Sequence, residues 1–192
     1  MKRYGLVIDV ERCIGCDTCA VACKAEHFIE QGSRLQVLTV GGAHPDTPAG
    51  VYPNLRMDFF PKTCMHCADA PCIRACPEQA INKREDGIVL VEESECTGCW
   101  LCVEECPYGA INVPEDKNII DKCDLCYERV DEGEVPFCVY CCETNAMHFG
   151  DLNDPDSTVS RLIKEKKAYN LLPEKKTKPA VFYFNPGERI GY

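Results

Sequence analysis

Cysteines dominate the chemistry that this sequence can perform. Seventeen occur in 192 residues, and 16 of them fall into four sets of four. The sets are Cys13, Cys16, Cys19 and Cys23; Cys64, Cys67, Cys72 and Cys76; Cys96, Cys99, Cys102 and Cys106; and Cys123, Cys126, Cys138 and Cys142. The first and third follow the spacing C-x2-C-x2-C-x3-C, which is used to bind [4Fe–4S] clusters. Sixteen thiolates at four per cluster predict four clusters, and hence a protein that carries electrons.

Two other uses of these cysteines fit the spacing less well. A disulfide scaffold is typical of short secreted chains, whereas this chain is long for that class, has an odd cysteine count and begins without the apolar run of a signal peptide. Zinc knuckles also use C-x2-C pairs. A single zinc ion, however, does not need a third cysteine two residues later and a fourth after three more. A zinc-binding interaction module therefore stays only as an alternative.

The pairing of the sets follows from a rule for two-cluster ferredoxins, in which the fourth cysteine of a run ligates the other cluster. Applied here, the rule predicts four ligand sets. They are Cys13, Cys16, Cys19 and Cys142 for cluster 1; Cys23, Cys123, Cys126 and Cys138 for cluster 2; Cys64, Cys67, Cys72 and Cys106 for cluster 3; and Cys76, Cys96, Cys99 and Cys102 for cluster 4. Consecutive pairing of the first set with the second, and of the third with the fourth, is the alternative. The 40-residue gap between Cys23 and Cys64 disfavours it, because that gap lacks a short hairpin linker.

The elements that must position these cysteines predict an α+β fold of two interlocked bacterial-ferredoxin-like units with loop insertions and a short C-terminal extension. Residues 1–26 and 114–150 form the outer unit, 64–113 the inner unit, 27–63 an insertion loop and 151–192 the extension for partner contact. We expect strands at 1–9, 35–40 and 181–184, a hairpin around the turn at 85–87, and a short helix capped near Ser157. The insertion is a candidate docking surface, or equally a flap that packs over the clusters.

Three residues near the cysteine ligands have a candidate role. Cys141 is left over, because the x3 spacing from Cys138 selects Cys142 as the ligand; we expect a buried free thiol. A swap of Cys141 for Cys142 is the alternative. His66 is expected to be a neighbouring donor or a structural residue, since its cysteine set is already complete. Trp100 either shields a cluster or belongs to the core. No nucleophile–base motif or phosphate-binding loop occurs, so the chain is not an enzyme on its own.

Charge and hydropathy limit the partners. The net charge of −10 and the pI near 4.9 argue against nucleic acid, which is bound by basic surfaces. No apolar run approaches the roughly 20 residues of a membrane span. We expect a cytoplasmic protein, or one that reaches the membrane only through a partner. Export to the periplasmic side together with a catalytic subunit is the alternative.

With the four sets established, the chain resembles the four-cluster iron–sulfur (beta) subunits of the molybdopterin oxidoreductases, the dimethyl sulfoxide reductase family. The resemblance spans nearly the whole length, and its motifs are DVERCIGCDTCAVAC at 9–23, the set at 64–76, CPYGAI at 106–111, KCDLC at 122–126 and FGDLNDP at 149–155. Glu143 and Asn145 depart from it, because the family usually has proline and glycine there.

The resemblance implies an electron-transfer subunit and supports the interlocked pairing. It further implies a large catalytic partner with a molybdenum or tungsten bis-pterin site, and often a membrane subunit that exchanges electrons with quinone. A free-standing polyferredoxin that moves between soluble enzymes is the alternative function. The substrate of the complex and the direction of electron flow are not encoded in this chain.

Overall fold

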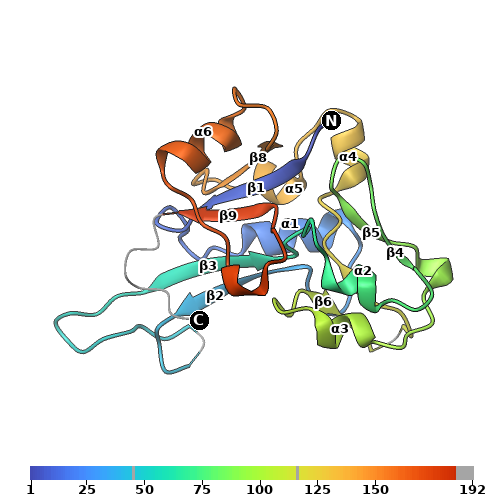
Figure 1. Cartoon of the computed structure of the whole chain (residues 1–192). Coiled ribbons are helices and arrows are strands. Elements are labelled where there is room, and N and C mark those ends of the chain that lie inside the picture. Colours follow the sequence, from blue (N-terminus) through green and yellow to red (C-terminus); the bar gives the residue numbers. More distant parts are fainter. Residues whose placement is uncertain (45, 116, 185–192) are drawn as a thin grey trace.

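The computed structural model describes residues 1–44, 46–115 and 117–184 and has a mixed α+β fold with small sheets (Figure 1). Its three-stranded sheet has the order β8-β1-β9, with β1 at Tyr4–Asp9, β8 at Met147–Asp151 and β9 at Val181–Phe184. Strand β1 pairs antiparallel with β8 and parallel with β9. The predicted strands at the two ends of the chain are confirmed, and they are neighbours.

A long hairpin occupies the predicted insertion. Strands β2 (Leu35–Val40) and β3 (Asp58–Thr63) pair antiparallel, and the hairpin extends away from the rest of the molecule (Figure 1). The sequence predicted only the first of these strands. Phe60 is 1% exposed and stacks on Tyr183 with ring centroids 4.5 Å apart, so the base of the hairpin packs on the three-stranded sheet.

The segment 64–113 is built from short local elements. Strands β4 (Ile81–Lys83) and β5 (Val89–Val91) form the predicted hairpin, and β6 (Ile111–Asn112) pairs with β7 (Asp121–Lys122). One-turn helices α2 (Pro71–Ala75) and α3 (Leu101–Glu105) pack together, and a 3-10 turn, η1, covers Glu93–Glu95. Proline begins α2, where its missing N–H costs no helical hydrogen bond.

The remaining helices lie near the two ends of the chain. Helix α1 (Thr18–Glu26) packs on α5 (Phe137–Tyr140), and α4 (Tyr127–Asp131) precedes α5. Helix α6 (Thr158–Glu165) lies against β8 and β1. The predicted cap at its start is confirmed, because the Ser157 hydroxyl accepts a hydrogen bond from the Ser160 N–H at 3.1 Å. A 3-10 turn, η2, covers Pro173–Lys175.

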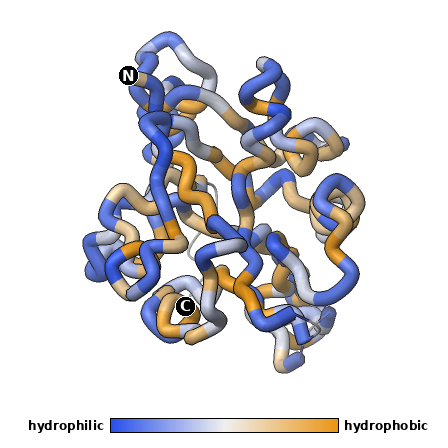
Figure 2. Tube along the Cα trace, turned by 90° about the vertical axis from the view of Figure 1, so that its right-hand side faces the viewer, coloured by the Kyte–Doolittle hydropathy of each residue, from blue (hydrophilic) through white to orange (hydrophobic). Residues whose placement is uncertain are grey.

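The main core lies between the three-stranded sheet, the base of the hairpin and the cysteine-bearing helices. It includes Leu6, Ile8, Phe60, Ile81, Leu125 and Tyr183 together with several cysteines. Figure 2 shows hydrophobic stretches toward the middle of the view and hydrophilic ones toward its edge. Across the described part of the chain, no helix has both the length and the apolar character required to cross a bilayer.

Candidate iron–sulfur cluster sites

Short helices hold the cysteine pairs that are four residues apart. Helix α1 contains Cys19 and Cys23, while the other three pairs start inside α2, α3 and α5 and finish at or just past the helix end. Because one helical turn separates positions i and i+4, each helix presents two thiols in fixed relation to each other. All 17 cysteines lie within the described residues and are free of disulfides.

The cysteines gather into four groups in space. Within a group, the charge of one thiolate is near enough to shift the pKa of another. Group 1 is Cys13, Cys16, Cys19 and Cys142; group 2 is Cys23, Cys123, Cys126 and Cys138; group 3 is Cys64, Cys67, Cys72 and Cys106; and group 4 is Cys76, Cys96, Cys99 and Cys102. Each group therefore joins three cysteines of one sequence set with one of another.

Burial controls the protonation of these thiols. Burial, together with the charge of neighbouring thiolates, raises the pKa of Cys19, Cys67 and Cys126 to about 12. Burial likewise raises the pKa of Cys102 and Cys123 to about 11. Without metal these groups are protonated at neutral pH, and binding of iron has to displace the protons, as it does at other thiolate sites.

Backbone N–H groups point at several of the sulfurs. The Leu125 N–H lies 3.4 Å from the Cys123 sulfur, and the Gly15 N–H is a hydrogen-bond donor to Cys13. Gly15 and Gly98 have φ of 69° and 68°, which glycine adopts without the clash that a Cβ brings. At Gly15, a tight turn and an N–H directed at sulfur therefore coincide.

Three equivalent turns follow the last cysteines of the sets. Gln79, Gly109 and Asn145 all have φ near 50°, and each donates its N–H to the carbonyl three residues before it. In two of the turns the next residue completes the pattern, since the N–H groups of Ala80 and Ala146 lie 3.3 Å from the sulfurs of Cys76 and Cys142. Asparagine tolerates positive φ, so the departure at Asn145 leaves the turn intact.

The third group of thiols lines a cavity whose other walls are largely apolar. Met65, Val89, Tyr108 and Ile111 surround the four sulfurs, and Lys122 provides the one charged side chain among the lining residues of the described chain. Tyr108 is 6% exposed and its hydroxyl lies 2.5 Å from the Thr177 hydroxyl, which in turn bonds to Cys67. Four convergent thiols in a water-poor pocket fit an iron–sulfur cluster.

Electrostatic interactions between thiols of different groups connect the groups in a linear order. The charge of Cys19 reaches Cys138, that of Cys64 reaches Cys123, and that of Cys102 reaches Cys72. These three pairs join group 1 to group 2, group 2 to group 3, and group 3 to group 4. The sulfur groups therefore form a chain through the molecule, with group 1 at one end and group 4 at the other.

Exposure distinguishes the two ends of that chain of groups. Among the cysteines, all of which are described, only Cys16 in group 1 and Cys99 in group 4 are exposed. An exposed apolar side chain lies near each of them in the sequence: Ile14, 59% exposed, near Cys16, and Trp100, 47% exposed, next to Cys99. The interpretation of Trp100 as ordinary core is wrong: it stands beside Cys99 at the surface, in the left-handed conformation that begins α3.

Cys141 and His66 differ from the sequence interpretation in detail. Cys141 is half-buried rather than buried, and Arg129 and Glu26 are its charged neighbours. His66 is 1% exposed; its Nδ1 accepts the Val89 N–H at 3.0 Å, and its Nε2 is buried without a partner among the described atoms. Both findings are consistent with residues beside the cysteine groups rather than within them.

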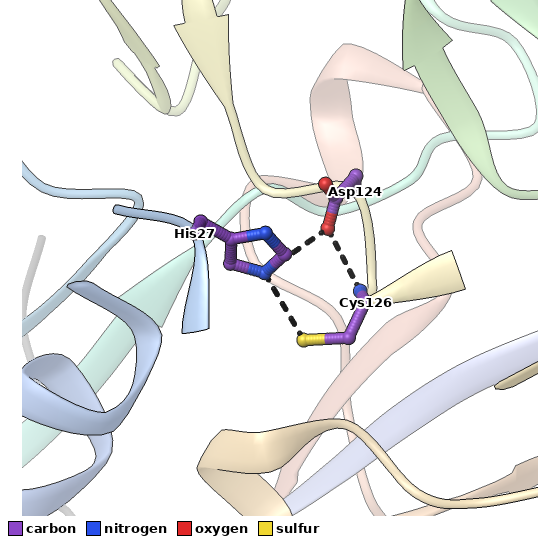
Figure 3. A group of neighbouring side chains, drawn as sticks. All are labelled: His27, Asp124 and Cys126. Atoms are coloured by element: carbon purple, nitrogen blue, oxygen red, sulfur yellow. Dashed lines mark hydrogen bonds and ion pairs between the residues drawn. The ribbon is translucent and has the colours of Figure 1, made fainter. Parts of the chain in front are cut away.

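Sequence reasoning missed His27, which no ligand spacing singled out. Its Nε2 lies 3.2 Å from the Cys126 sulfur and 3.5 Å from Asp124, and the Cys126 N–H donates to the same carboxylate at 2.8 Å (Figure 3). The three residues line a polar cavity of about 580 Å³. Burial lowers the pKa of His27, while Asp124 opposes that shift. The imidazole follows α1 and meets Cys126 only through the fold.

Four thiol groups in an α+β chain of short elements define an iron–sulfur electron-transfer protein. Comparison with protein families matches residues 55–152 to the 4Fe-4S dicluster domain. The chain is 43% identical to a dimethyl sulfoxide reductase iron–sulfur subunit of Halobacterium salinarum, over 96% of this chain and 80% of that one. It is 36% identical to a sulfite dehydrogenase subunit of Allochromatium vinosum, over 95% and 83%. It is 37% identical to a tetrathionate reductase subunit of Salmonella typhimurium, over 94% and 72%.

These likenesses extend over nearly the whole chain and identify the family that the sequence motifs predicted. The chain belongs to the iron–sulfur subunits of the molybdopterin oxidoreductase complexes. It is the electron-transfer subunit of such a complex and not the catalytic one. It carries a 4Fe-4S dicluster domain.

Proposed function

We propose that the chain binds four [4Fe–4S] clusters, one in each thiol group, with the ligand sets that the crossing rule predicts. The single observation that carries this proposal is the grouping of the sulfurs, above all the approach of Cys142 to Cys13 and Cys19. Consecutive pairing would require Cys142 to join the third sequence set instead. When bound, the clusters would supply one-electron redox chemistry.

The fold that this pairing implies is a pair of interlocked ferredoxin-like units. The inner unit is 64–113, and the outer unit combines 1–26 with 114–150, which the pairing of β1 with β8 supports. The insertion at 27–63 and the extension at 151–192 complete the chain, although residues 185–192 lie outside the described part. The two segments that flank the inner unit in the sequence therefore meet in one sheet.

The protein's residues hold the four groups in line, exclude water and tune potentials. The buried side chains around group 3 keep water away from its sulfurs, and N–H donors such as Leu125 stabilise negative charge on sulfur. The linear order of groups 1 to 4 favours a path with entry at one exposed end and exit at the other. Cys16 and Cys99 are the proposed contact points with two redox partners.

The partner at one end is proposed to be a large catalytic subunit with a molybdenum or tungsten bis-pterin site. The relatives' names describe subunits of sulfite, tetrathionate and arsenate enzymes, so the substrate varies among relatives that share this electron-transfer chain. The second partner is a membrane subunit or a soluble redox protein, and the chain is expected to meet a membrane only through it. Exposed Val51 and Tyr52 near the tip of the β2–β3 hairpin favour the docking interpretation of the insertion.

Iron and acid-labile sulfide analysis tests the proposal on anaerobically purified protein with its native partners. Four cubanes correspond to about 16 iron and 16 sulfide per chain. A large pterin-containing subunit in the same preparation is expected. A value near 12 leaves one group vacant and sinks the four-cluster assignment, and zinc in place of iron overturns the electron-transfer function itself.

A further inference from the structure

Lys122 is a buried cation beside the third thiol group. It is the last residue of β7, directly precedes Cys123 and is 3% exposed. Its ammonium donates hydrogen bonds to two backbone carbonyls, that of Cys123 at 2.9 Å and that of Val89. These contacts anchor the side chain at one place in the interior.

Lys122 has no carboxylate partner among the described residues. The ion pairs formed by the described residues leave it out, whereas nearby Arg34 pairs with both Asp121 and Asp124 at 2.7 Å. Carbonyl dipoles satisfy the N–H groups of an ammonium but do not neutralise it. A buried charge of this kind is costly unless an anion lies close to it.

The cavity beside Lys122 contains four thiols that are cluster ligands in the proposed assignment. Lys122 lines the same cavity as Cys64, Cys67, Cys72 and Cys106. Burial raises the pKa of the Cys64 and Cys72 thiols, and the positive charge of Lys122 acts in the opposite direction on both. The ammonium therefore stabilises negative charge at this group.

We propose that the buried ammonium of Lys122 is a fixed positive charge that raises the reduction potential of the cluster held by group 3. The inference rests on the proposed assignment of that cluster to Cys64, Cys67, Cys72 and Cys106. Reduction adds one electron and no atoms, so the charge of the buried cluster becomes more negative by one. A cation in a low-dielectric interior stabilises the reduced form more than the oxidised form. At a given solution potential, a larger fraction of this cluster is consequently reduced than in the absence of the lysine.

The experiment is a redox titration of the complete complex, monitored by electron paramagnetic resonance, with Lys122→Met. Methionine keeps most of the side-chain volume and removes the charge. We expect one of the four clusters to become at least tenfold harder to reduce at fixed potential, which is a fall of about 59 mV for a one-electron couple. The signal that shifts is expected to be the one that disappears in Cys67→Ser.

Lys83 offers a matched control. It is exposed on β4 and also donates to a backbone carbonyl, that of Ala68. Because solvent and salt screen an exposed charge, Lys83→Met is expected to leave all four potentials unchanged. An equal shift in both variants overturns a specific effect of Lys122.

A second variant covers the case in which Lys122→Met loses iron. Lys122→Gln keeps an N–H donor for the two carbonyls but carries no charge, and we expect the same fall in one potential. Four intact clusters with unmoved potentials in either uncharged variant overturn the inference. The iron content of the unaltered protein decides the four-cluster proposal separately, so the two failures are distinguishable.

Discussion

The segment 64–113 and the flanking segments 4–26 and 120–151 bring cysteines together in different ways. Inside 64–113, the hairpin of β4 and β5 and the packing of α2 on α3 place the thiols through contacts that stay within this one segment. The flanking segments meet where β1 pairs with β8, with Ile8 opposite Met147, and where α1 packs on α5. The first arrangement depends on contacts within one continuous segment, and the second on the pairing of segments more than 100 residues apart. Similar groups of four thiols are thus formed in two ways, by contacts within one segment and by the pairing of distant segments.

The largest effect is expected where the long-range arrangement depends on one ligand. Cys142→Ser removes a thiolate from group 1, and we expect loss of about four of 16 iron atoms, or conversion to a three-iron cluster with loss of about one. Cys141→Ser, one residue away, is the matched control and is expected to keep all the iron. Iron analysis and electron paramagnetic resonance of both variants give the answer. Equal loss in both contradicts the assignment of Cys142.

Core truncations in each region test whether the two regions hold their clusters independently. Ile8 in β1 and Ile81 in β4 are 0% and 1% exposed, and replacement of either by alanine should cost about 2–4 kcal/mol of stability. We expect Ile8→Ala to release the clusters of groups 1 and 2 first on heating, and Ile81→Ala those of groups 3 and 4. Thermal loss of the separate resonance signals measures this. Loss of the same signals in both variants contradicts a difference between the regions.

The two exposed ends are expected to serve different partners. Ile14→Glu near Cys16 and Trp100→Glu beside Cys99 each place a charge on an apolar contact surface. We expect each to weaken partner binding by about 1.4 kcal/mol, which slows electron transfer at low partner concentration about tenfold. Stopped-flow reduction by each partner separates the two effects. Lys164→Glu on α6 is an exposed control. If either end variant slows both partners equally, the assignment of separate ends is wrong.

The smallest effect concerns the helix that covers the three-stranded sheet. Ser157→Ala removes the cap of α6 and should lower the free energy of unfolding by about 1 kcal/mol. Ser94→Ala in η1 is the control, because the Ser94 hydroxyl bonds only to the exposed Glu92 side chain. Thermal denaturation compares the two. A loss from Ser94→Ala as large as that from Ser157→Ala contradicts the capping role of Ser157.

Local patterns predicted much of the fold. The alternation of strand and turn residues predicted β4, β5 and β9, and Ser157 predicted the start of α6, because these depend on neighbouring residues. The second strand of the insertion, β3, was missed. Its sequence DFFPKT contains a proline, which a strand tolerates only at certain positions, and its pairing with β2 spans a long loop.

The sequence motifs indicated the cluster chemistry, the family and the alternatives for pairing, because cysteine spacing is dictated by the geometry of the metal group. The packing of the folded chain sets which thiols are neighbours and which are exposed at the ends. It also brings His27 and Lys122 close to the thiol groups. The sequence spacing of these two residues does not identify either of them as a neighbour of a cluster ligand. Their effect depends on burial and distance, and those properties arise when segments far apart in the chain pack together.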